Sequence, residues 1–236
     1  MMRLSIFVVL FVLFSGIVGC VSKYDYRLYT FPTVFDGQTR YYLYEETIIT
    51  KGKDTIKGER TTKIERVSPN KVVFVEYRHL PEMSVPMDST VALIKEDGLY
   101  NEQSYYYCDG WKPFKKKGQE QTIAWDWTDQ KFKHTREVSA SMAKPCGAAV
   151  YKFKGVTEYL GMGKLKKKFK GFRYFQMRSS DSEITFLGKT NKYTETYWDL
   201  KGVGLFRFEN EDEHQRFIMR LKEIYTDKSQ YKAHFK

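Results

Sequence analysis

Alternation of apolar and polar positions with a period of two dominates most of the chain. The alternating runs are rich in Tyr, Phe, Val, Ile and Thr, and short segments containing Gly, Pro, Asn or Asp separate them, which is the pattern of strands joined by tight turns. No segment after the N-terminal leader shows the period of a helix. Strands are predicted at residues 41–50, 55–67, 71–78, 89–95, 99–107, 122–127, 131–138, 150–160, 164–177, 183–187, 192–200, 204–209 and 215–225.

About a dozen strands with short connections predict an all-β protein built on one large antiparallel sheet. Because neighbouring strands twist relative to one another, a sheet of this size must curl. The predicted architecture is an open or partly closed barrel with a concave apolar face, and a two-sheet β-sandwich is the alternative. No Ser/Gly-rich linker and no internal repeat divides the chain, so one domain is expected.

One long apolar run, residues 4–18, lies at the N-terminus behind a single cation, Arg3. It covers about fifteen residues, whereas a membrane-spanning helix needs about 20. A cationic start, a short apolar stretch and small residues at its end are typical of a secretory signal peptide. An uncleaved signal anchor is the alternative.

The motif that closes this run is Ile17-Val18-Gly19-Cys20, which resembles the lipobox of bacterial lipoproteins. The resemblance implies that the Cys20 sulfur receives a diacylglycerol, that residues 1–19 are removed, and that the new N-terminus is acylated as well. Each buried CH2 contributes about 0.8 kcal/mol, so two or three chains hold a protein firmly on a membrane. Residues 20–236 are therefore expected to form a single β domain with an N-terminal lipid anchor.

The charge of the mature chain favours anionic partners. Without Arg3 it carries 39 Lys and Arg against 29 Asp and Glu, a net charge of +10, which draws a protein held at a bilayer towards anionic headgroups. In the segment KLKKKFKGFRYF, strand alternation places Lys166, Lys168 and Lys170 on one face. They are candidates for contact with an anionic surface, and protection of an exposed edge strand is the alternative role.

The two cysteines that follow Cys20 are Cys108 and Cys146. An even remainder in an exported protein is a candidate disulfide. Two separate buried thiols are the alternative, because sequence gives no geometry.

Catalytic and metal-binding motifs are not found. The four histidines, at positions 79, 134, 214 and 234, have no ligand-like spacing. The chain contains no G-x-S-x-G, P-loop or G-x-G-x-x-G motif. We therefore expect no enzyme activity, no metal and no cofactor, and a nucleic-acid partner is not expected for an exported lipoprotein.

The C-terminal stretch YWDLKGVGLFRFENED, residues 197–212, carries a second resemblance. Its aromatic pair, the step Gly202-Val203-Gly204-Leu205 and the charged strand that follows are similar to the closing motif of exported bacterial β-proteins. Those proteins are similar in fold to lipoprotein-localisation carriers, in which a curved sheet forms an open barrel around an acyl-binding cavity. Gly202 and Gly204 are expected to form a structural turn, since glycine relieves steric limits where a strand bends.

Two functions follow from these observations. The first is a non-enzymatic, envelope-anchored lipoprotein that binds a lipid or other apolar ligand in the concave face of its barrel. The second is a structural or protein-interaction component of the cell envelope. Val21, not Asp, follows Cys20, so in a Gram-negative source the outer membrane, facing the periplasm, is the expected location.

Replacing Cys20 with Ala tests the lipobox. The variant should accumulate as an unprocessed precursor without lipid label, because the sulfur that accepts the diacylglycerol is gone. Metabolic labelling with a fatty acid and the mobility of the protein on a gel measure both effects. Normal processing and membrane attachment of the variant would contradict the resemblance.

Overall fold

A computed structural model describes residues 25–53, 55–80, 83–107, 110–113, 115–116, 120–125, 131–136, 138–139, 151–186 and 189–235. Cys20, Cys108 and Cys146 lie outside these ranges, so the lipid anchor and the disulfide stay predictions. Within the described residues, no helix is both long and apolar enough to cross a membrane.

Strands make up most of the described chain, and the all-β prediction is confirmed. They are β1 (Arg40–Thr50), β2 (Ile56–Ser68), β3 (Lys71–Leu80), β4 (Met83–Ile94), β5 (Gly98–Tyr107), β6 (Trp111–Pro113), β7 (Lys115–Lys116), β8 (Glu120–Ala124), β9 (Lys131–Arg136), β10 (Val138–Ser139), β11 (Tyr151–Phe169), β12 (Phe172–Phe186), β13 (Lys189–Leu200), β14 (Gly204–Glu211) and β15 (Gln215–Tyr225). The helices are η1 (Tyr26–Leu28), α2 (Thr33–Asp36) and α3 (Lys228–His234).

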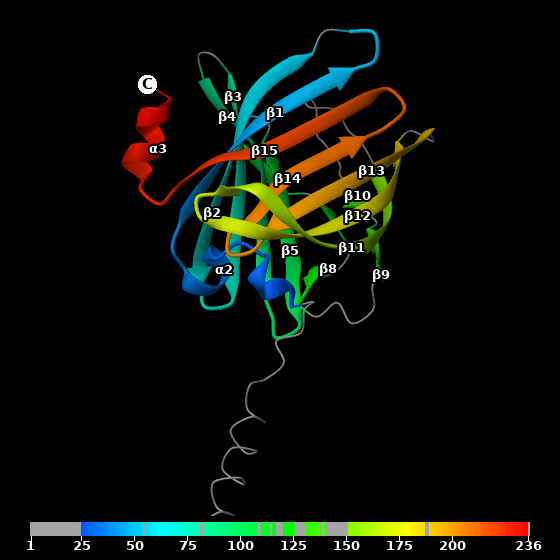
Figure 1. The fold of residues 1–236 in the computed structure, drawn as a ribbon. Coiled ribbons are helices and arrows are strands. Elements are labelled where there is room, and N and C mark those ends of the chain that lie inside the picture. The colour runs from blue at the N-terminus through cyan, green and yellow to red at the C-terminus, as the bar shows by residue number, and fades with distance from the viewer. Residues whose placement is uncertain are drawn as a thin grey trace, which may run out of the picture.

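Thirteen of these strands form one curved antiparallel sheet, in the order β6-β5-β4-β3-β2-β1-β15-β14-β13-β12-β11-β9, with β8 also pairing with β5 (Figure 1). The strands β10 and β7 form a separate pair. Two meanders, β1–β6 and β11–β15, meet where β1 pairs with β15, from Tyr41 opposite Tyr225 to Thr50 opposite Gln215. Among the described strands the two outer ends of the sheet do not pair with each other, so the barrel is open, as predicted.

The core lies on the concave face, and a segment that precedes the sheet fills one end of it. Tyr42 and Tyr44 of β1 are fully buried there, and Tyr26 and Val34 of the N-terminal segment pack against the same cluster. In Figure 1 this dark-blue segment, with η1 and α2, lies at the lower end of the strands. Its backbone is bonded to both meanders: Tyr26 N donates to Trp125 O at 2.8 Å, and Gly202 N donates to Leu28 O at 2.8 Å.

The C-terminal helix α3 packs on the opposite, convex face. The ring of Tyr231 stacks on Tyr41 with centroids 4.4 Å apart, and Phe235 stacks on His79 at 3.9 Å. The sequence predicted no helix in this region, which is wrong. The helix has seven residues, about two turns, which is too short for a 3.6-residue period to be recognised in the sequence. The local signal for its start is Asp227, the N-cap residue, whose carboxylate accepts a hydrogen bond from Ser229 N.

The hairpin β11–β12 differs most from its prediction. The sequence placed one strand through residues 164–177, but the chain turns at Lys170 and Gly171, where φ is +45° and +91°. Lys170 therefore leaves the strand and pairs with Glu223, so its placement on one strand face with Lys166 and Lys168 is wrong. Four residues before this tip oppose a single residue of β12, and the bulge curls the hairpin until Phe169 contacts Phe206 at 5.3 Å.

Gly202 lies in the connection from β13 to β14 and Gly204 is the first residue of β14, with φ of +76° and +99°. A Cβ on Gly202 would lie 2.8 Å from the ring of Phe172, and one on Gly204 would lie 2.6 Å from the ring of Phe31. Both conditions exclude a side chain, because left-handed backbone is strained for L residues and the space is filled. The turn therefore fixes how the N-terminal segment and the β11–β12 hairpin approach one another.

Replacing Gly204 with Ala should lower the free energy of unfolding by about 2 kcal/mol or more, from positive φ together with the clash on Phe31. Gly52 provides a matched control, since its φ is +73° and nothing lies within 4 Å of a Cβ there. Gly52→Ala should cost only about 1 kcal/mol. Urea unfolding midpoints measure both, and equal losses would show that the Phe31 contact adds nothing.

Candidate functional site

A cavity of about 310 Å³ opens on the concave face between the two meanders. Strands β2–β5 and β8 supply one wall, and β14, β15 and the N-terminal segment supply the other. Its apolar lining is Phe31, Phe74, Ala92, Leu99, Ile123, Leu205 and Met219, and its polar lining is Thr62, Glu76, Asp88, Thr90, Asn101, Ser104 and Thr122. The cavity is thus amphipathic, not uniformly apolar as the sequence suggested for this face.

Strand register explains why these polar side chains gather. Thr62 lies opposite Glu76, and Glu76 lies opposite Asp88. Thr90 in turn lies opposite Ser104. Residues directly opposite each other on antiparallel strands point to the same face of the sheet, so one polar band crosses β2 to β5 on the concave side.

Charges at the edge of this band are paired across strands. Arg60 lies between two carboxylates, with Nε 3.2 Å from Glu46 and Nη1 3.0 Å from Glu76. Arg78 Nε lies 2.9 Å from the other oxygen of Glu46, whose side chain is only 6% exposed. Such inward ion pairs are stable only because each charge has a partner.

Asp88 is a carboxyl group of the cavity with a strongly shifted pKa. Burial raises its pKa to about 7, and the carboxylate of Glu76 adds to the rise while Arg60 opposes it. The cause is the loss of hydration of a charged carboxylate, which favours the neutral acid. Near neutral pH Asp88 therefore exists in both forms, and it can donate or accept a hydrogen bond from a molecule in the cavity.

The other half of the concave face is filled by a second polar cluster. Arg178 Nε donates to Asp199 Oδ2 at 2.9 Å, and its guanidinium lies 3.8 Å from the centre of the Tyr197 ring. Tyr26 of η1 is hydrogen-bonded into the same cluster. Gln176 beside it is fully buried. This cluster fastens η1 to β12 and β13.

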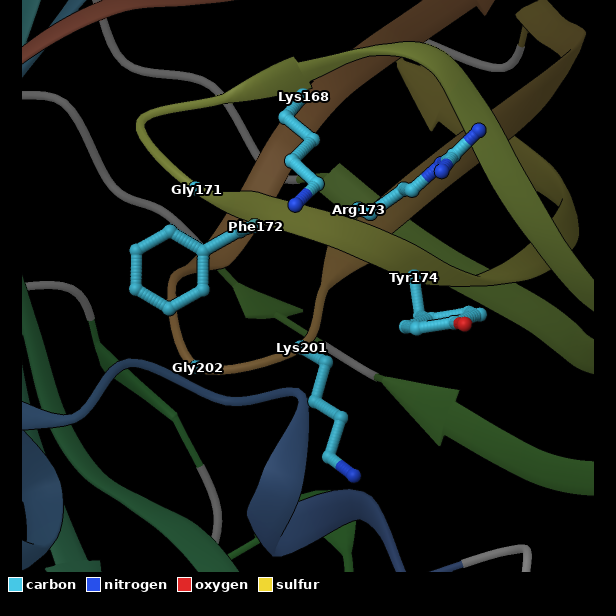
Figure 2. Close-up of a pocket in the computed structure, with 7 residues that line it drawn as sticks. All are labelled: Lys168, Gly171, Phe172, Arg173, Tyr174, Lys201 and Gly202. Carbon is cyan, nitrogen blue, oxygen red and sulfur yellow. The ribbon is translucent and has the colours of Figure 1, made fainter.

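A second hollow of about 460 Å³ lies at the end of the sheet where the β11–β12 tip meets the β13–β14 turn. Figure 2 shows Lys168 and Arg173 on the hairpin above Lys201 on the turn. The two elements are joined directly, because Lys201 N donates to Tyr174 O at 2.8 Å. The lining residues are Lys168, Gly171, Phe172, Arg173, Tyr174, Lys201 and Gly202.

The residues predicted from sequence are thus only partly brought together. Lys168 and Gly202 line this hollow, whereas Lys166 does not, and Gly204 packs against Phe31. Among the described residues, no group of three or more His, Cys, Asp or Glu is arranged to hold a metal ion.

The acidic residues of the cavity and the cations opposite Lys168 were not predicted from the sequence. A signal existed for Glu76, which continues the alternation of the inward Val72 and Phe74 with a charge. A second signal was the Lys-Gly pair at 170–171, which marks the turn that brings Arg173 back towards Lys168. Lys201 had no such signal, because only the tertiary fold places it there.

Comparison with known proteins gives structural likenesses alone. Neither a protein-family model nor a curated protein sequence matches the chain. A candidate lipoprotein from Parabacteroides distasonis is 10% identical, covering 80% of this chain and 96% of that one, with a TM-score of 0.48. A candidate exported protein with a YmcC-like fold from Bacteroides fragilis is 10% identical, covering 79% of this chain and 95% of that one, with a TM-score of 0.36. A LolA superfamily protein from Nitrosomonas europaea is 8% identical, covering 86% of this chain and 89% of that one, with a TM-score of 0.35.

Replacing Asp88 with Asn should remove a pH dependence of stability. Because the pKa of Asp88 is raised in the folded protein, the unfolded chain loses this proton at lower pH, and the free energy of unfolding falls as pH rises from about 4 to about 7. The contribution is at most about 1.4 kcal/mol per pH unit. Urea unfolding from pH 4 to 8 should give a shallower decline for Asp88→Asn, with the exposed Asp181→Asn as control. Parallel curves for Asp88→Asn and the wild type would contradict the assignment.

Proposed function

We propose that this protein is a lipid-anchored, non-catalytic component of the bacterial cell envelope that binds a small amphipathic molecule in its concave cavity. The carrying observation is the cavity of about 310 Å³, with Phe31, Phe74 and Met219 on its apolar side and Glu76 and Asp88 on its polar side. This volume lies at the lower end of the range for small-molecule sites, about 300–1,000 Å³. A short acyl chain or a compact lipid-like molecule fits that size.

The polar side selects the head group of the ligand. Two acidic side chains face the cavity, and Asp88 is held partly protonated by burial and by Glu76. A carboxylate head would be repelled by Glu76, whereas a hydroxyl, an amide or an amine would find an acceptor. The proposed ligand therefore has an apolar body and a neutral or cationic hydrogen-bond donor.

The proposal is non-catalytic because of the side chains that line the cavity. Four hydroxyl side chains line the cavity, those of Ser104, Thr62, Thr90 and Thr122. Ser104 Oγ lies 2.8 Å from Asn101 Nδ2 and 3.2 Å from Thr90 Oγ1. No histidine or cysteine lines the described cavity. A serine without an adjacent base is not activated.

A second candidate function is protein contact through the edge of β11. Among the described residues, strand β9 pairs with β11 from Phe153 to Glu158, and further along β11 Leu160 and Met162 are about half exposed. The lysines that follow on this edge disfavour pairing with another strand. The cavity therefore remains the better supported site.

The test uses native mass spectrometry of the mature protein purified without detergent. A co-purifying amphipathic molecule should be seen with the wild type and lost with Ala92→Leu, since Ala92 lines the cavity and is almost fully buried. Val91→Leu adds bulk on the opposite face of the same strand and should keep the ligand. Loss from both variants, or no ligand in wild type and none taken up from added lipid extract, would contradict the proposal.

A further inference from the structure

Three cationic residues line the hollow between the β11–β12 tip and the β13–β14 turn. Lys168, Arg173 and Lys201 come from three different strands or turns, and none of them forms an ion pair with a described carboxylate. Arg173 Nε donates to Leu165 O at 3.2 Å, which fixes the direction of its side chain. Cationic side chains that lie at one end of the molecule and form no ion pair with a described carboxylate favour an anionic partner.

Two exposed aromatic rings lie among these cations. Phe172 is 39% exposed and Tyr174 is 51% exposed, and Figure 2 shows both beside the cationic side chains. Aromatic rings next to lysine and arginine are typical of surfaces that lie at the headgroup level of a bilayer.

The N-terminus of the domain lies at the same end of the sheet. Leu28 O accepts a hydrogen bond from Gly202 N, and Leu28 N lies 3.4 Å from Asp25 O. Cys20 precedes Asp25 by five residues, which span at most about 18 Å when fully extended. A lipid on Cys20 therefore holds this end, and not the opposite one, next to the membrane.

We propose that Lys168, Arg173, Lys201, Phe172 and Tyr174, here called the rim patch, bind the surface of an anionic bilayer. The proposal rests on the lipid anchor of the proposed function, and it adds an orientation. The cations contact lipid phosphates while the two rings enter the headgroup layer. The domain then stands on the membrane with the β13–β14 turn down and the β1–β2 turn, at the other end of the strands, away from it.

The experiment measures partitioning onto vesicles without the lipid. The mature chain with Cys20→Ser is mixed with vesicles of phosphatidylglycerol and phosphatidylethanolamine, or of phosphatidylcholine alone, and sedimented. We expect binding to the anionic vesicles only, weakened by salt. Each cation near such a surface raises the partition coefficient about fivefold. The partition coefficient should therefore fall by on the order of a hundredfold in the rim-patch variant, which combines Lys168→Gln, Arg173→Gln and Lys201→Gln.

The matched control replaces Lys51, Lys53 and Lys57 with Gln at the opposite end of the strands. It removes the same charge, and it should change partitioning far less than the rim-patch variant. Equal losses would show that net charge alone acts, and no binding to anionic vesicles would overturn the proposal. Circular dichroism of each variant verifies that the sheet is intact.

A second measurement separates this proposal from the anchor. In lipidated wild-type protein on anionic vesicles, hydrogen exchange of the rim patch should slow relative to phosphatidylcholine vesicles, while the β1–β2 turn is unchanged. If Cys20 carries no lipid, the anchor fails but sedimentation of the Cys20→Ser chain still decides the rim patch. If the patch prefers a soluble acidic protein to anionic vesicles, the membrane proposal is wrong and the anchor stands.

Discussion

The pairing of β1 with β15 is the contact on which the rest of the structure depends. Ten residue pairs, from Tyr41–Tyr225 to Thr50–Gln215, join the first strand to the last. Each meander is built from local hairpins, whereas this junction pairs segments from opposite ends of the chain. Forming it costs more conformational entropy than a local hairpin, because a longer loop must be closed. The β1–β15 junction joins the two meanders into one curved sheet. The concave cavity lies between the meanders, with Leu205 and Met219 on one side and Phe74 and Leu99 on the other.

The contents of the concave face determine where space remains. The N-terminal segment enters from one end and places Tyr26 against Arg178 and Asp199, so a buried ion pair occupies the β12–β13 side. On the opposite side, Arg60 is shared by Glu46 and Glu76, and Asp88 remains beside an unfilled volume. Burying these charges is tolerated because they are paired, whereas burial raises the pKa of Asp88.

The proposed anchor, the rim patch and the cavity are arranged along the strands. The bond from Gly202 N to Leu28 O couples the start of the described chain to the turn that carries Lys201, so an anchor on Cys20 would share one end with the cationic surface. The Gly204 turn also touches Phe31, which lines the cavity. A protein standing on a bilayer in this orientation would hold its ligand site close to the source of amphipathic molecules.

The period-two alternation was enough to predict an all-β chain, one large antiparallel sheet and its open barrel, because a strand buried on one face must alternate whatever its neighbours are. The leader and the lipobox stay predictions from the sequence alone, since such signals are recognised before a chain folds. The helix α3 and the turn at Lys170 were missed because short elements carry too few residues to show a period. Glu76, Asp88, Arg173 and Lys201 became site residues only in the tertiary structure. Their grouping depends on strand register and on the β1–β15 junction, which no local pattern encodes, because alternation tells which face a residue occupies but not which strand lies beside it.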